Sequence, residues 1–244
     1  LTHLCDSEDE RTMREIFDSY IDNAFDGYQQ AEFKFKQFEI NYKQHFPHCL
    51  DAAILDIGIG RGEMLTCMKN WGYRNYEGID ISVSTVNYCK SIGLRCTLVE
   101  DTASWLGERS ENFELITLLD VLEHIRKEDT IYFLKFLRKS LINGGKLIIQ
   151  VPNLQSPDGQ LHRYNDFTHE VGFTEHSMRQ VLLVAGFDKF QFYGFESITS
   201  KSVRACIRTR LRNIFWQYIK ITRTINGNLN PRILNPVLFS VVTK

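Results

Sequence analysis

The sequence lacks the marks of several large classes of protein. Its six cysteines form no CxxC pair and no zinc-finger spacing, which predicts reduced thiols. No apolar run approaches the ~18 residues that span a bilayer, and no basic and apolar leader is visible, so we expect a cytoplasmic protein, at most peripheral at the inner membrane face. A formal net charge of −1 over the whole chain does not indicate a nucleic-acid partner.

What the sequence does contain is an alternation of strand-like and helix-like segments. With 244 residues, 43% of them hydrophobic, the chain can form one sizeable α/β core. We expect a Rossmann-like, seven-stranded, mostly parallel sheet with helices on both faces and an antiparallel last strand. The expected strands are 52–58, 75–80, 95–99, 113–119, 146–152, 189–195 and 236–243. The expected helices are 62–71, 83–92, 102–107, 128–142, capped by Asn143–Gly145, and 173–187, with Thr174 as its N-cap.

Four regions follow from this pattern. They are an N-terminal helical lid (1–50), a core (51–198), a basic amphipathic insertion (199–230) and a terminal strand that completes the core sheet (231–244).

The stretch "ILDIGIGRG" (54–62) places a glycine turn directly after the first expected strand. Such a turn exposes backbone N–H groups to a nucleotide-like ligand. The spacing of Gly58, Gly60 and Gly62 is G-x-G-x-G, and Glu63 stands where a dinucleotide fold needs its third glycine. Glu63 would repel a pyrophosphate, and no P-loop lysine follows. A ligand without phosphate is favoured, and an NAD-dependent reductase is disfavoured.

Acidic residues lie at or just after the ends of the next three expected strands. Asp80 ends "YEGID", where a carboxylate can accept both hydroxyls of a ribose. "VED" (99–101) and "LLDVLEHI" (118–125) follow the third and fourth expected strands. The carboxyl ends of parallel strands meet at one edge of the sheet, so these acids are candidates for a single site.

In this order, "ILDIGIGRGEML", "GIDIS", "VED", "LLDVLEHI" and "LIIQVPN" resemble the class I S-adenosylmethionine-dependent methyltransferases, over residues 50–195 and the terminal strand. The resemblance implies S-adenosyl-L-methionine as cofactor, S-adenosyl-L-homocysteine as product, and no metal. It assigns Asp56, Gly58 and Gly60 to the methionine end, Asp80 to the ribose, Ile81 and Asp101 to the adenine, and Leu119 with Asp120 to the rim near the sulfonium. "GRGE" is similar to sugar methyltransferases of bacterial surface-glycan clusters, of the O-antigen or capsule type.

The polar segment 153–174 is our candidate for catalysis, because it is far longer than usual strand-to-helix connections. His169 is the first candidate for a general base, oriented by Asp166 or Glu170, since imidazole titrates near neutrality. His162 and His124 are further candidates. Two alternatives stay open: a histidine that only anchors the loop, and a divalent metal held by His162, Asp166 and His169.

Two flanking segments remain. Residues 8–46 show an aromatic helical stripe, Phe17, Tyr20, Ile21, Ala24, Phe25 and Tyr28, and Tyr42 comes close enough to the first strand to reach the cofactor. Residues 199–226 carry seven basic residues and no acid, a charge of +7 that leaves −8 on the remainder. This basic amphipathic helix either packs on the core or contacts an anionic membrane or substrate.

We therefore expect an O-methyltransferase acting on a sugar hydroxyl in glycan or polysaccharide biosynthesis. A methyltransferase for a small or lipid-soluble metabolite, and a non-catalytic S-adenosylmethionine-binding module, are the alternatives. The sequence indicates no oligomeric state.

Overall fold

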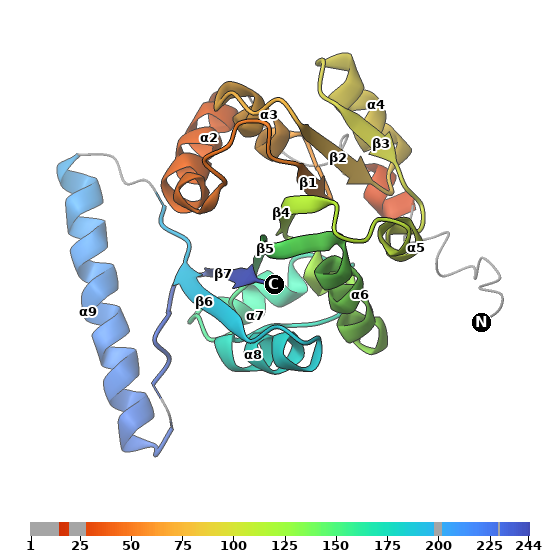
Figure 1. The fold of residues 1–244 in the computed structure, drawn as a ribbon. Coiled ribbons are helices and arrows are strands. Elements are labelled where there is room, and N and C mark those ends of the chain that lie inside the picture. Colours follow the sequence, from red (N-terminus) through yellow and green to blue (C-terminus); the bar gives the residue numbers. More distant parts are fainter. Residues whose placement is uncertain (1–14, 20–27, 198–201, 229) are drawn as a thin grey trace.

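A central seven-stranded sheet organises the molecule (Figure 1). The computed structural model describes residues 15–19, 28–197, 202–228 and 230–244. The strands are β1 (Ile54–Ile57), β2 (Tyr76–Asp80), β3 (Cys96–Leu98), β4 (Phe113–Leu119), β5 (Leu141–Pro152), β6 (Lys189–Gly194) and β7 (Val237–Thr243). Their order is β3-β2-β1-β4-β5-β7-β6. Strands β1 to β5 pair in parallel, while β7 is antiparallel to both β5 and β6, which confirms the predicted fold class.

Helices cover both faces of this sheet. They are α2 (Tyr28–Tyr42), α3 (Glu63–Asn70), α4 (Val83–Ser91), α5 (Thr102–Gly107), α6 (Lys127–Ser140), α7 (Gly159–Tyr164), α8 (Glu175–Val184) and α9 (Val203–Ile225), with 3-10 turns η1 (Lys43–His45) and η2 (Leu122–His124). One buried cluster joins α2, α3 and α4 to the sheet, and a second joins α5, α6 and α8 to it. All four residues of β1 are buried, as expected for a strand covered on both faces.

The predicted cap at Asn143–Gly145 is wrong. Helix α6 ends at Ser140, and β5 begins at Leu141 and runs through both glycines. Gly144 N–H donates to the Lys244 carbonyl, and Lys244 N–H donates to the Gly145 carbonyl, both at 3.0 Å. The backbone groups of this segment are therefore used to extend the sheet, with a register irregularity opposite Phe113.

The N-cap prediction for α8 is confirmed. The side chain of Thr174 accepts a hydrogen bond from Ser177 N–H at 3.1 Å, and Ser177 Oγ accepts one from Thr174 N–H at 2.9 Å. This capping box satisfies two backbone donors that the helix cannot satisfy itself. It fixes the end of the long segment 153–174, which also contains α7.

Of the predicted N-terminal stripe, Tyr20, Ile21, Ala24 and Phe25 lie outside the described residues. The described turn at 15–19 is helical, and α2 packs Phe38 and Tyr42 into the core. Helix α9 joins β6 to β7 and stands beside the sheet as a separate rod in Figure 1. None of the described helices combines the length and apolar character needed to cross a membrane.

Candidate functional site

The glycine turn lies at the carboxyl end of β1, the middle of the parallel part of the sheet. Gly58, Gly60 and Gly62 all adopt positive φ, between 49° and 74°. Gly58 N–H donates to the Ile79 carbonyl (2.9 Å), which holds the turn against β2. A Cβ on Gly58 would lie 2.3 Å from Val121 Cγ2, so a side chain is excluded there by both backbone and packing.

Asp56 lies beneath this turn and is almost fully buried. Thr117 Oγ1, on the neighbouring strand β4, donates to Asp56 Oδ1 at 2.6 Å. Burial raises the pKa of Asp56 to about 8, although the Thr117 hydrogen bond acts in the opposite direction. A cation brought near this carboxyl would favour its ionised form.

Asp80 links the end of β2 to the glycine turn. Its Oδ1 accepts the backbone N–H of Ser82 at 2.9 Å. Burial raises the pKa of Asp80, while hydrogen bonds from backbone groups of Ser82, Gly60 and Ile59 oppose that rise. The structure thus brings together the predicted ribose-binding acid and the glycines predicted to hold the methionine end.

The residues around the turn fit S-adenosylmethionine. A Cβ on Gly60 would meet one atom within 4 Å, Glu63 Oε2 at 3.8 Å, so the space over this glycine is open for a ligand. The side chains nearby are the acids Asp56, Glu63 and Asp80, of which Glu63 pairs with Lys34 at 2.9 Å. Such a cradle suits a donor that carries a cationic sulfur and an ammonium group and has no phosphate.

The predicted adenine and rim residues occupy the same edge of the sheet. Asp101 is exposed and caps α5, where its carboxylate accepts from Ser104 N–H at 3.0 Å and from Ser104 Oγ. The Ser104 hydroxyl lowers the pKa of Asp101. Ile81 and Leu119 are half-buried at the ends of β2 and β4. Asp101 is therefore already engaged in a local cap, whereas Ile81 and Leu119 present apolar surface.

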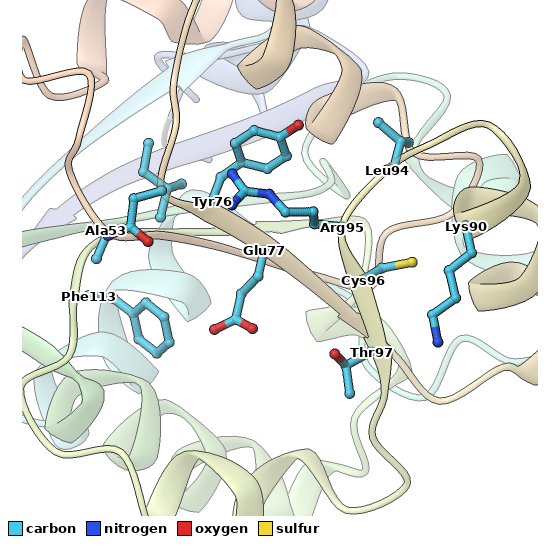
Figure 2. Close-up of a pocket in the computed structure, with 11 residues that line it drawn as sticks. Ala53, Tyr76, Glu77, Lys90, Leu94, Arg95, Cys96, Thr97 and Phe113 are labelled. Atoms are coloured by element: carbon cyan, nitrogen blue, oxygen red, sulfur yellow. The ribbon is translucent and has the colours of Figure 1, made fainter.

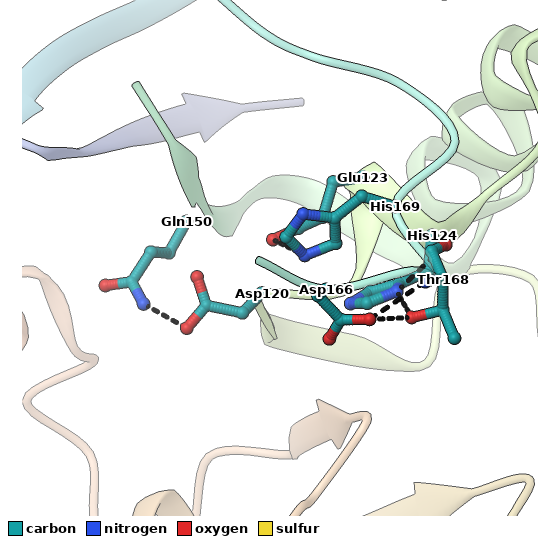
Figure 3. A network of polar contacts seen from close by, with 7 residues as sticks. All are labelled: Asp120, Glu123, His124, Gln150, Asp166, Thr168 and His169. Carbon is teal, nitrogen blue, oxygen red and sulfur yellow. Dashed lines mark hydrogen bonds and ion pairs between the residues drawn. The ribbon is translucent and has the colours of Figure 1, made fainter. Parts of the chain in front are cut away.

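Asp120 follows β4 in a left-handed conformation, with φ of 55°. Its Oδ2 accepts from Gln150 Nε2 at 2.7 Å (Figure 3). Gln150 Oε1 in turn accepts a hydrogen bond from the hydroxyl of Tyr42. Tyr42 is completely buried, so it reaches this edge through Gln150. The Asp120 side chain stays accessible to water, yet the protein around it restricts its solvation, which raises its pKa.

His124 is held by the long segment 153–174. Its Nδ1 lies 2.8 Å from Thr168 Oγ1, which donates to Asp166 Oδ1 at 2.6 Å (Figure 3). Burial, with His169 adding to the effect, lowers the pKa of His124 to about 4. Asp166 therefore orients His124 through Thr168, whereas the sequence had suggested it as the partner of His169.

Glu123 is the carboxyl group that faces His169. Glu123 Oε1 lies 4.0 Å from His169 Nε2, and the ring centroids of His169 and His124 are 4.7 Å apart. Glu123 is buried, and neither of its side-chain oxygens has a hydrogen-bond partner among the described residues. Burial raises the pKa of Glu123 well above its usual range, and the charge of Asp120 adds to the rise. The other suggested partner, Glu170, is exposed, and its N–H donates to the Glu123 carbonyl.

A divalent metal would find a different ligand set from the one suggested by sequence. Ligand atoms of Glu123, His124 and His169 lie within 4.8 Å of one another, the one such group among the described residues. His124 Nδ1 already contacts Thr168 Oγ1, which leaves Nε2 as the nitrogen of this ring that could face an ion. His162, on α7, is half-buried, and like His169 it opposes the rise in the pKa of Asp120 that burial causes.

Sequence reasoning missed Glu123, Thr168 and Gln150. All three lie within or beside quoted motifs, but their residue types do not indicate which neighbouring group each side chain contacts.

Sequence reasoning also missed the contacts of residues 15–19. The Phe17 ring lies edge-on to His124 at 5.7 Å, and the Asp18 carboxylate accepts from Ser82 Oγ at 2.6 Å. This turn therefore touches both the segment after β2 and the segment after β4.

Figure 2 shows a separate hollow lined by Ala53, Glu77, Arg95, Phe113 and neighbours. Ala53 and Phe113 lie at the amino ends of β1 and β4, the edge of the sheet opposite the glycine turn. This hollow is therefore not part of the candidate site.

Comparisons with known proteins agree with this geometry. Residues 30–191 match the family described as "Methyltransferase domain". The fold is similar to an S-adenosylmethionine-dependent methyltransferase from Archaeoglobus fulgidus, with 19% identity, a TM-score of 0.67, and coverage of 94% of this chain and 99% of that one. It is also similar to the 1,6-didemethyltoxoflavin-N1-methyltransferase of Burkholderia thailandensis, solved with S-adenosylhomocysteine, with 15% identity, a TM-score of 0.61, and coverage of 100% and 92%. No curated protein sequence matches the chain significantly.

Proposed function

Because this chain belongs to the methyltransferase domain family, as a class I enzyme that uses S-adenosyl-L-methionine, we propose that it methylates a hydroxyl group of a sugar during glycan or polysaccharide biosynthesis. When bound, the donor supplies a methyl group already activated by its cationic sulfur and leaves as S-adenosyl-L-homocysteine. The protein then has to position the acceptor and receive its proton.

One observation carries the choice of a hydroxyl. His169 lies beside the buried carboxyl of Glu123, at the same edge of the sheet as Asp120 and the glycine turn. A hydroxyl needs a base to become a good nucleophile, and an imidazole backed by a carboxyl group is a suitable base near neutral pH. A non-catalytic binding module would not need this pair.

In this proposal the donor is held by Asp56, Gly58 and Gly60 at its amino-acid end, and by Asp80 at its ribose. Ile81 and Asp101 border the adenine, and Leu119 the methyl-transfer edge.

His169 Nε2 faces Glu123, so Nδ1 is the nitrogen left to receive the acceptor's proton. The carboxyl of Glu123 stabilises the imidazolium that forms and keeps the ring in place. Asp120 lies with Leu119 at the rim near the sulfonium of the donor, and His162 is the alternative base. His124 and Asp166 hold the segment 153–174 in position through Thr168.

The proposal also covers how the chain is divided into regions and where in the cell the enzyme acts. Residues 1–50 act as a lid over the core 51–198, residues 199–230 are an insertion, and 231–244 complete the sheet. We place the enzyme in the cytoplasm, in peripheral contact with an anionic membrane through 199–226. A small or lipid-soluble metabolite as acceptor is the second candidate, because the described neighbours include an enzyme named for such a substrate.

The test is methyl transfer from labelled S-adenosylmethionine to a panel of acceptors: free sugars, sugar nucleotides, lipid-linked saccharides and small heterocycles. We expect label in a base-stable ether linkage on a saccharide. Label on nitrogen of a heterocycle would support the second candidate. Donor binding without any transfer, in the presence of all classes, would support a binding module.

A further inference from the structure

Helix α9 presents its most apolar face to solvent. Six large side chains recur four and three residues apart and are between 52% and 77% exposed. We call these the apolar stripe: Ile207, Leu211, Ile214, Tyr218, Ile221 and Ile225. On the opposite side of the helix, Ala205 is buried and Thr209, Arg212 and Trp216 are half-buried. An exposed apolar surface of this length is unfavourable in water, so it indicates a partner.

Basic side chains border the apolar stripe on both edges. With about 100° of rotation per residue, Arg204 and Arg208 lie along one edge and Arg210 along the other. All three are exposed. Arg212 instead lies over the Trp216 ring, 4.8 Å from its centroid, on the far side. An apolar centre with cationic edges matches the boundary between acyl chains and anionic headgroups, where arginine stems pack on apolar surface and their guanidinium groups contact phosphate.

The charges argue against two other occupants. Residues 202–228 contain six basic residues and no acid, so pairing α9 with its own copy would bring like charges together without compensation. A nucleic acid would match the charge but would leave the apolar stripe in water. No described helix can cross a bilayer, so a lipid-bound α9 lies in the plane of the surface.

The far end of α9 is tied to the candidate site. The Arg223 guanidinium donates to the Gln155 carbonyl at 3.0 Å. Gln155 belongs to the segment 153–174, which also carries His162 and His169. This hydrogen bond joins the far end of α9 to the segment that carries both histidines.

We propose that α9 binds the surface of an anionic phospholipid membrane with its apolar stripe inserted, and that the acceptor is a lipid-linked molecule whose headgroup enters the site from that surface. The second half of this statement rests on the proposed function. The first half concerns lipid binding alone and is tested without turnover.

The full chain is sedimented with vesicles of phosphatidylcholine alone or with 30% phosphatidylglycerol. Arg204→Gln, Arg208→Gln and Arg210→Gln together should weaken partition into the anionic vesicles about 100-fold, since each basic residue near such a surface contributes about fivefold. The matched control is Lys36→Gln, Lys127→Gln and Lys135→Gln, which removes the same charge from exposed positions on the body and should change partition little. A second variant, Ile207→Ser, Ile214→Ser and Ile221→Ser, should lose binding to both vesicle types.

Equal binding of the wild type to neutral and anionic vesicles, or none at 50 mM salt, would overturn the proposal. So would a stable lipid-free dimer that the serine variant converts to monomers. In activity assays, the arginine variant should keep transfer to a water-soluble acceptor and lose transfer to a vesicle-borne one. Loss of both acceptors with lipid binding intact would instead count against the proposed function.

Discussion

Asp80 has a backbone partner in the protein and a proposed partner in the donor. In the described structure its carboxylate holds Ser82 N–H, and its proposed role is to accept the hydroxyls of the donor ribose. We expect Asp80→Ala to weaken S-adenosylmethionine binding by about 1.5–3 kcal/mol, the range for hydrogen bonds to a charged group. Isothermal titration calorimetry measures this loss directly.

The matched control is Asp51→Ala. Asp51 is an exposed acid that pairs with Arg74, away from the glycine turn. Its removal should leave donor affinity unchanged. If a folded Asp80→Ala protein binds the donor as tightly as the wild type, the ribose assignment is wrong.

His169 and Glu123 are proposed to act as a pair, so their variants should fail in different ways. His169→Ala should lower kcat by about 10²–10⁴ with donor affinity nearly intact, because a general base acts on the acceptor. Glu123→Gln keeps the shape and removes the ionisable group. It should lower kcat less and shift the acidic limb of the kcat–pH profile.

Rapid-quench measurement of methyl transfer across pH 5–9 separates these outcomes. His176→Ala, on the exposed side of α8, serves as control. An unchanged pH profile in Glu123→Gln would make that residue a packing element. If EDTA abolished turnover and a divalent cation restored it, the group Glu123, His124 and His169 would hold a metal instead.

Asp56 gives a prediction for stability. Its folded pKa of about 8 lies above the ordinary value of 3.8, so between these two pH values the folded state binds more protons than the unfolded state. Stability should therefore fall as pH rises through this window, by up to about 1.4 kcal/mol per pH unit for one group. Asp56→Asn retains an acceptor for Thr117 and should flatten the pH dependence.

Urea unfolding of the donor-free protein at pH 6, 7 and 8 measures that slope. The slope of the variant should be less negative than that of the wild type. Equal slopes would mean that Asp56 is ionised in the folded protein already at pH 6.

At the level of elements, the turn at 15–19 spans two sides of the candidate site. Asp18 binds Ser82 after β2, and Phe17 packs on His124 after β4. We expect Asp18→Ala combined with Phe17→Ala to raise the dissociation rate of the donor about 30-fold, because two contacts worth about 1 kcal/mol each are lost. Stopped-flow fluorescence measures this rate, and the exposed Glu15→Ala is the control. An unchanged rate would show that this turn does not retain the donor.

The elements that the sequence predicted well are those whose ends are set by residues close together in the sequence. The hydroxyl pair Thr174 and Ser177 marks the start of α8 because a capping box needs only four consecutive residues. Asn143–Gly145 was misread because glycines after a helix usually cap it. Here Lys244, distant in sequence, accepts and donates the hydrogen bonds that draw them into β5. No local pattern contains that partner.

At the scale of the whole molecule, the parallel sheet explains why much of the site could be predicted. Once strands were placed, Gly58, Asp80 and Asp120 had to meet at one edge. Which polar groups face each other within that edge depends on backbone details. Glu123 and His169 come within 4.0 Å from segments far apart in sequence, and no pattern of residue type or spacing indicates that contact.

The position of β7 has a consequence for folding kinetics. Strand β7 lies between β5 and β6, and β6 has no other strand partner among the described residues. Pairs such as Lys146 with Thr243 are distant in sequence, and contacts of that kind form slowly. Until β7 arrives, one edge of β5 is left open, with Leu147, Ile149 and Val151 on an unpaired strand. During refolding this open edge can pair with another chain, so the yield of native enzyme should fall as protein concentration rises.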